Sequence, residues 1–76
     1  MTYSTHLLRH LRFTIGQNIQ RRRVQKKLSL QKLSRLSGVS EQLIDHYELG
    51  KSEIGLREML RIACILEIKT EDLLVR

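Results

Sequence analysis

The chain predicts an all-helical fold, and three features of its sequence lead to this interpretation. It contains no proline and only four glycines among 76 residues, so little interrupts a helix. Leu30, Leu33 and Leu36 recur at helical spacing and predict a short helix. Gly38 ends that helix, and Ser40 then opens a second short one. Two helices this short bury little area alone, so we expect them to pack across each other at a sharp bend.

Size and composition indicate a single domain with a packed core. Hydrophobic residues make up 41% of the chain, which is enough for a core and too many for an obligately disordered chain. The formal net charge of +6 is unevenly distributed: residues 1–40 hold nine Lys or Arg and no acid, whereas residues 41–76 hold five Lys or Arg and eight Asp or Glu. This pattern predicts a cationic face that attracts nucleic acid or, less commonly, an acidic membrane or protein. A plain solvated basic helix is the alternative.

The cysteine, histidine and hydropathy patterns restrict the compartment and the kinds of site. Cys64 is the single cysteine, which excludes an intramolecular disulfide, disfavours structural zinc and indicates a small hydrophobic residue in the core or an interface. No stretch approaches about 20 apolar residues and no signal-peptide segment is visible, so we expect a cytoplasmic, nucleoid-associated protein without a membrane partner. His6 and His10 are four residues apart, but two ligands alone make a poor metal site, and no cofactor is expected.

The N-terminal part of the chain predicts a helix preceded by a segment with two interpretations. Residues 1–12 are either a basic arm or an extra short helix capped by Ser4 or Thr5. The main helical domain is then expected to cover residues 13–76. Its first helix is predicted over residues 14–27, with the first of these residues as the cap.

Two further helices follow, each with a serine at its start. Ser29 caps a helix that runs to about Ser37. Ser40 caps the next helix, which ends near Leu49 with Gly50 in the position after the helix where a left-handed conformation is needed.

The helix predicted over residues 56–66 is apolar nearly all round. Its main stripe consists of Leu56, Met59, Leu60, Ala63 and Leu66. Ile62, Cys64 and Ile65 lie off this stripe, and such a helix is usually covered on more than one side. The cover is either the N-terminal leucines or a second subunit. A last short helix, capped by Thr70, turns its two leucines inward.

The order and spacing of these residues resemble the Cro/C1-type helix-turn-helix proteins, also called the XRE family, over residues 13–75. The resemblance is carried by Ile15, Gly16, Ile19, Arg23, Leu28, Ser29, Leu33, Gly38, Val39, Ser40, Ile44, Tyr47, Glu48, Gly50, Lys51, Ile62, Ala63, Leu66, Leu73 and Leu74. It implies an all-α, five-helix lambda-repressor-like DNA-binding bundle with the helix-turn-helix at residues 29–49. It also implies sequence-specific binding of double-stranded DNA, usually as a homodimer.

The outward face of the helix that starts at Ser40 holds the candidate base-reading residues. At about 100° per residue, Gln42 and His46 point away from the preceding helices. The Gln42 amide can pair bidentately with adenine, and His46 can reach a base edge one turn later. Leu43 and Glu41 lie on the flanks, where they can pack on a thymine methyl and accept from cytosine N4, respectively. Ordinary solvated side chains are the alternative for Gln42 and His46.

Candidate phosphate-binding residues surround that helix. The N-terminus of the helix after Ser29 offers free N–H groups and the positive end of a dipole. The candidates are Gln31, Lys32, Arg35 and Ser40, and the resemblance adds Lys51 and Ser52 from the loop after Gly50. A plain surface position is the alternative for each of them.

The resemblance also implies a partly buried structural ion pair between Arg23 and Glu48. Two exposed charges that contribute little are the alternative. The chain departs from the family pattern at Leu30, where many members have a glutamine that contacts phosphate. Glu41 and Asp45 make the predicted reading helix acidic, which lowers its affinity for phosphate unless nearby cations offset them.

These features favour a dimeric, operator-binding transcriptional regulator of the repressor type. An antitoxin or a small protein-interaction modulator with the same fold is the alternative, and it adds a protein partner. An enzyme is disfavoured, because the sequence shows no convincing Ser-His-Asp arrangement, no phosphate-cradling glycine loop and no room for a second layer.

Overall fold

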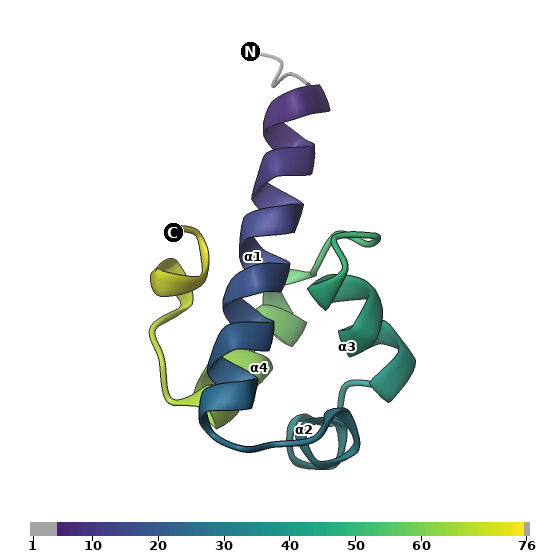
Figure 1. Cartoon of the computed structure of the whole chain (residues 1–76), viewed down its shortest axis with the longest axis vertical. Helices are drawn as coiled ribbons and strands as arrows, with labels where there is room; N and C mark the ends of the chain where they lie inside the picture. The colour runs from purple at the N-terminus through teal and green to yellow at the C-terminus, as the bar shows by residue number, and fades with distance from the viewer. Residues whose placement is uncertain (1–4, 76) are drawn as a thin grey trace.

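Four α-helices and one short 3₁₀-helix make up the computed structural model, which describes residues 5–75 (Figure 1). The elements are α1 (Thr5–Gln25), α2 (Leu30–Ser37), α3 (Glu41–Glu48), α4 (Leu56–Leu66) and η1 (Thr70–Leu73). The described residues contain no strand, so the all-helical class is confirmed. Where a fifth α-helix was expected, they form the 3₁₀-helix η1. None of their helices combines the length and hydropathy needed to cross a bilayer.

α1 is longer than the sequence predicted, since it begins at Thr5 and runs without a break to Gln25. Residues 5–12 are its first turns and form neither a loose arm nor a separate helix, while the other candidate cap, Ser4, lies outside the described residues. The residue expected to cap the helix, Thr14, is buried inside it. The continuity follows from the absence of proline, because a single glycine costs a helix only about 1 kcal/mol. In Figure 1, α1 projects beyond the other helices at its N-terminal end.

Gly16 allows α1 and α3 to approach each other closely. A Cβ atom at this position would lie 2.1 Å from the Tyr47 carbonyl oxygen and 2.9 Å from the Glu48 carbonyl oxygen. Any larger residue would therefore push the two helices apart. The one glycine in α1 marks the point where α3 crosses it, and this crossing sets the orientation of α3.

The serine caps at the starts of α2 and α3 are confirmed. Ser29 Oγ accepts from the Lys32 amide at 3.0 Å, and Ser40 Oγ accepts from the Leu43 amide at 3.1 Å. Gly38 ends α2 in the left-handed region, with φ 77°, which a residue with a side chain adopts only at a cost. Because Gly38 ends α2 only two residues before Ser40 caps α3, the chain must change direction sharply between the two helices.

The core lies where α1, α2, α3 and α4 converge, and η1 closes one side of it. Its fully buried side chains are Ile19, Leu33, Ile44, Ile62, Leu66 and Leu73. Burying an aliphatic side chain of this kind stabilises a fold by about 1.5–3 kcal/mol. Every element contributes at least one of them, so the inward face of α3 is fixed by the whole bundle.

α4 buries only part of the predicted stripe: Ala63 and Leu66 are buried, and Met59 packs against the core. Ile62, expected off the stripe, is fully buried, whereas Leu56 and Leu60 are 71% and 50% exposed. Helices α1 and α2 and the 3₁₀-helix all contact α4. The side of α4 that is buried is therefore set by these neighbours and not by the spacing of its apolar residues alone. Cys64 is exposed, so it is not a core residue.

Leu74, which was expected to point inward, lies at the surface, and so does Leu36 in α2. Leu36 is 47% exposed and Leu74 is 43% exposed. A spacing of three residues turns each successive side chain by about 60° around the helix. Leu30, Leu33 and Leu36 therefore cannot all face the core, and Leu33 alone is fully buried. In the same way, only the first of the adjacent Leu73 and Leu74 is buried.

Candidate nucleic-acid interface

α3 turns one face into the core and leaves the other free. Ile44, Tyr47 and Glu48 are buried, whereas Glu41 and Gln42 are exposed. The helical period separates these two sets. The N-terminal half of α3 is thus the part of the helix that a partner can reach.

The four base-reading candidates lie together on the outer side of α3. Two shallow grooves meet at Gln42: one is lined by Leu30, Glu41, Gln42 and Asp45, the other by Ser40, Gln42, Leu43 and His46. Leu43 is half-buried and packs against the core, and His46 is also half-buried. Gln42 and Glu41 consequently extend furthest from the surface.

Asp45, one of the two acids expected to lower the affinity of α3 for phosphate, is not fully exposed. It is half-buried, and its charge helps to raise the pKa of the Arg23 guanidinium. This interaction offsets part of the negative charge of α3. Glu41 remains as an exposed carboxylate in the first turn of the helix.

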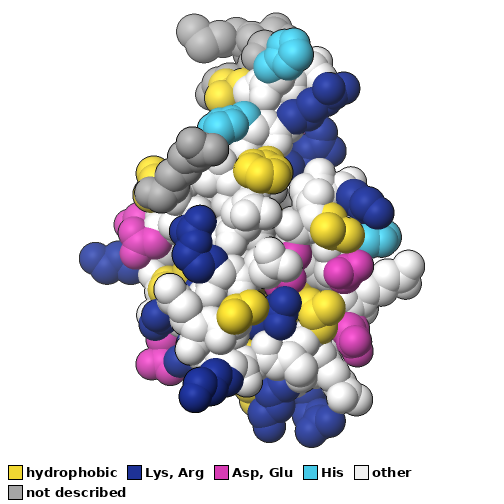
Figure 2. All heavy atoms as spheres, in the orientation of Figure 1, with side chains coloured by type: hydrophobic (Ala, Val, Ile, Leu, Met, Phe, Trp, Pro, Cys, Tyr) yellow, Lys and Arg dark blue, Asp and Glu magenta, His cyan; other side chains and the backbone are white. Residues whose placement is uncertain are grey.

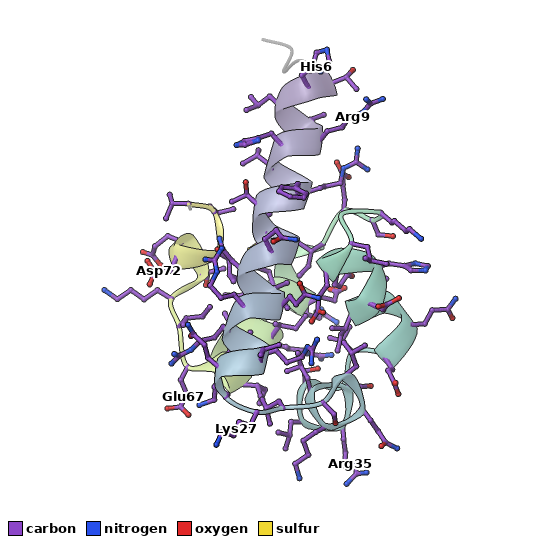
Figure 3. The ribbon with its side chains drawn as sticks, viewed as in Figure 1. His6, Arg9, Lys27, Arg35, Glu67 and Asp72 are labelled. Carbon is purple, nitrogen blue, oxygen red and sulfur yellow. The ribbon has the colours of Figure 1, made fainter. Side chains whose placement is uncertain are left out.

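The beginning of α2 lies beside the reading face, because Leu30 shares a groove with Glu41 and Gln42. The α2 side chains Gln31, Lys32 and Arg35 are exposed. Figure 3 shows Arg35 pointing away from the bundle. Ser40, at the start of α3, accepts a hydrogen bond through Oγ and can still donate its hydroxyl hydrogen. These donors lie near the N-terminal halves of α2 and α3.

Lys51 is held at the opposite end of α3 by the helix terminus itself. The Gly50 amide donates to the Tyr47 carbonyl at 3.1 Å, and the Lys51 amide donates to the His46 carbonyl at 2.9 Å. This pair of bonds is a Schellman motif, with Gly50 at φ 72°. The Lys51 side chain is exposed and Ser52 is half-buried. Candidate phosphate donors therefore lie at both ends of the reading helix.

Arg23 and Glu48 form an ion pair that joins α1 to the end of α3. Arg23 Nε donates to Glu48 Oε2 at 2.7 Å, and Nη2 donates to Oε1 at 3.0 Å. Arg23 Nη1 also donates to the Leu28 carbonyl at 2.8 Å. The hydrogen bond that Arg23 donates to the Glu48 carboxylate raises the pKa of the Arg23 guanidinium above its ordinary value. Glu48 is only 4% exposed, so the pair is largely removed from water.

The charges are unevenly arranged over the surface. In Figure 2, Lys and Arg side chains gather at the lower end of the molecule, over α2, and at the upper right beside α1. Asp and Glu side chains lie between them on the right-hand side, over α3. Within residues 5–75, no three His, Cys, Asp or Glu side chains are close enough together to hold a metal ion. The prominent surface feature is thus an outward helix bordered by cations.

Comparison with known proteins relates the chain to a sequence family and to a solved structure. The sequence model of the helix-turn-helix family matches residues 19–73, from the middle of α1 to the end of η1. Among solved structures, the chain is similar to the restriction-modification controller protein C.AhdI from Aeromonas hydrophila, with a TM-score of 0.78 and 29% sequence identity. That similarity covers 82% of this chain and 94% of the controller protein. No curated protein sequence matches the chain.

Proposed function

This chain belongs to the helix-turn-helix family of the Cro/C1 (XRE) type and is a DNA-binding transcriptional regulator, and from that premise we propose that it is a repressor-type protein that binds a specific operator as a homodimer. The observation that carries this proposal is the outward face of α3, with Gln42 exposed in its first turn. A helix with its side chains is about 10–12 Å across, and the major groove is about 12 Å wide. α3 is the recognition helix in this proposal, and the protein has no catalytic function.

Base reading is assigned to the N-terminal half of α3. Gln42 is the principal reader, since its amide matches the donor and acceptor that adenine presents in the major groove. His46 reads a neighbouring base edge one turn later. Leu43 packs on a thymine methyl group, and Glu41 accepts from cytosine N4. The shallow grooves that meet at Gln42 support this assignment, because they bring the four side chains to one surface.

Phosphate binding is assigned to donors at both ends of α3. Gln31, Lys32 and Arg35 of α2, with Ser40, face one backbone of the groove. Lys51 and Ser52 face the other. Such contacts fix the register of the protein on the duplex and carry no sequence information themselves. The exposure of all these residues except the half-buried Ser52, and the Schellman motif that fixes the Lys51 backbone, support this division.

The homodimer follows from the small size of the reading surface. A single recognition helix places only three or four side chains on base edges, which is few for operator specificity. Two copies related by two-fold symmetry read two half-sites about 34 Å apart. Large apolar side chains remain exposed away from α3, including Leu36, Leu56 and Leu60, and these offer area for subunit contact.

Selection of bound DNA from a random duplex pool at two salt concentrations tests the proposal. We expect an enriched inverted repeat with half-sites one helical turn apart, and a steep loss of affinity at the higher salt because bound phosphates release counterions. Sedimentation of the complex should give two chains per duplex. Flat enrichment at both salt concentrations would contradict sequence-specific binding, and one chain per duplex would contradict the dimer.

A further inference from the structure

The first turns of α1, residues 5–10, are the part of the fold that neither the core nor the recognition helix uses. Residues 5–18 precede the region matched by the helix-turn-helix family model, which begins at residue 19. The first turns of this segment project beyond the other helices (Figure 1). Every residue from 5 to 10 is exposed. A rigid helix that extends past its own domain needs a further explanation.

The face of this extension is aligned with α3. Gly16 marks the side of α1 that contacts α3, because its missing Cβ would meet the Tyr47 carbonyl oxygen. At about 100° per residue, Arg9 lies within about 20° of that direction and Arg12 within about 40°. Figure 3 shows Arg9 pointing from α1 toward the side of the molecule that carries α3. Both arginines therefore lie on the side from which α3 approaches DNA.

The extension also lies beside the loop that carries Lys51. A Cβ atom on Gly50 would lie 3.5 Å from Phe13 Cα and 3.9 Å from the Arg12 carbonyl carbon. The loop after α3 thus touches α1 at the level of Arg12. Arg9 lies one turn further out, about 4.5 Å along the helix axis. Lys51, Arg12 and Arg9 consequently follow one another along one edge of the molecule.

Neither arginine is neutralised by an acid within the described residues. The ion pairs formed there are Arg23–Glu48 and Lys26–Glu67, and residues 5–40 contain no Asp or Glu. Arg12 lines a groove together with Glu53, but the two form no ion pair. The Arg12 Nε is buried without a hydrogen-bond partner in the described structure. Arg9 is exposed and Arg12 is half-buried, so both unpaired cations reach the surface at this edge.

We propose that Arg9 and Arg12 bind DNA phosphates next to the one bound by Lys51, so that α1 extends the backbone contact beyond the recognition helix. This inference rests on the proposed function. Two arginines one helical turn apart, on long flexible side chains, can each bind a different phosphate of the same strand. The contact adds affinity and salt dependence without base preference.

The salt dependence of binding tests this proposal, with the inverted-repeat duplex from the selection experiment as the probe. The variants are Arg9→Gln and Arg9→Gln/Arg12→Gln. Lys69→Gln is the matched control, since Lys69 is an exposed cation in the segment that leads to η1, on the far side of α1 from α3. We expect Arg9→Gln to reduce the slope of log K against log salt by about 0.9 per protomer, and the double variant by about twice that. Lys69→Gln should leave the slope unchanged.

A second comparison locates the contact. Shortening the duplex at both ends until only the inverted repeat remains should weaken the wild-type protein several-fold and leave Arg9→Gln nearly unaffected. Thermal unfolding of Arg9→Gln should match that of the wild type, because the side chain is exposed. The ratio of affinities for matched and mismatched repeats should not change in either arginine variant.

The outcomes separate this inference from the proposed function. If the wild type enriches a repeat but Arg9→Gln and the double variant keep its salt slope, the inference falls and operator binding stands. If Arg9→Gln changes the sedimentation of the free protein and not the salt slope, the extension is an interface between copies, and the inference is overturned. If the wild type binds no duplex, both proposals fall together.

Discussion

Arg23 of α1 holds the Glu48 carboxylate at the end of α3 through two parallel hydrogen bonds of 2.7 and 3.0 Å. The third donor, Nη1, binds the Leu28 carbonyl in the connection to α2. One guanidinium thus ties the ends of α1 and α3 to the start of the helix-turn-helix. Glu48 is buried, so loss of Arg23 alone would leave an uncompensated charge inside the protein.

Removing one member of this pair should destabilise the protein more than removing both. Arg23→Met leaves a buried, unpaired carboxylate and should lower the free energy of unfolding by about 3 kcal/mol. Arg23→Met/Glu48→Leu should recover much of that loss, and urea unfolding measures both. The Lys26–Glu67 pair is the control. Because Glu67 is exposed, breaking this pair should change the free energy of unfolding little. A double variant less stable than Arg23→Met would contradict this account.

Gly16→Ala should destabilise the fold although alanine is the better helix former. The new methyl group would lie 2.1 Å from the Tyr47 carbonyl oxygen, and separating α1 from α3 should cost about 2 kcal/mol. For a domain of this size, that loss corresponds to a decrease in Tm of roughly 10 °C in thermal unfolding followed by circular dichroism. Gly55→Ala is the control, because its Cβ would meet only the flexible Glu58 carboxylate. Equal effects of the two substitutions would argue against a special contact at Gly16.

Local chemistry made the helix-turn-helix predictable from sequence. Ser29 and Ser40 cap helices through their own hydroxyl groups, and Gly38 and Gly50 adopt the left-handed φ that ends a helix. Each of these features depends on a few adjacent residues. The outward position of Gln42 follows from the helical period once the helix is placed. Its contact with a base remains a prediction, since it depends on a partner.

Features set by distant neighbours were not predictable in the same way. The inward face of α4 depends on three elements that pack against it, so Ile62 is buried and Leu56 exposed. The length of α1 was missed because Thr14 was interpreted as a cap, whereas the helix runs through this residue from Thr5. Asn18 was not singled out, because an asparagine in a helix has no sequence signature for contacts more than 50 residues away.

Asn18→Asp should release the C-terminal segment from α1. Asn18 Nδ2 donates to the Leu73 carbonyl at 2.8 Å and to the Val75 carbonyl at 2.7 Å, and a carboxylate would oppose both acceptors. We expect a loss of about 2 kcal/mol and faster hydrogen exchange of the Leu74 amide, which lies in this segment. Gln20→Glu introduces the same charge at an exposed position of α1 and should leave that exchange unchanged. Unaltered exchange in Asn18→Asp would show that the segment is held by packing alone.

Stability should fall in alkaline solution because Tyr47 is buried. Burial, with a smaller contribution from the Glu58 charge, raises the pKa of the Tyr47 hydroxyl above 10.0. Folding therefore favours the protonated phenol: its contribution is complete below pH 10.0 and is lost as the pH rises through the folded-state pKa. In a Tyr3→Phe background Tyr47 is the only tyrosine, so ultraviolet absorbance follows its ionisation directly. Ionisation below pH 10.0 would contradict this prediction, and Tyr47→Phe should reduce the alkaline loss.

Gln42→Ala and Lys51→Ala should both weaken DNA binding, but only Gln42→Ala should do so in a sequence-dependent way. If Gln42 pairs with adenine, its removal should cost about 1–3 kcal/mol per half-site on the preferred repeat and little on a repeat changed at that base pair. If Lys51 binds phosphate, its removal should weaken both repeats alike and reduce the salt slope by about 0.9 per protomer. Titrations of both duplexes at several salt concentrations measure these effects. Equal weakening of both repeats by Gln42→Ala would contradict base reading by Gln42. A change in base preference with Lys51→Ala would contradict its assignment as a phosphate-binding residue.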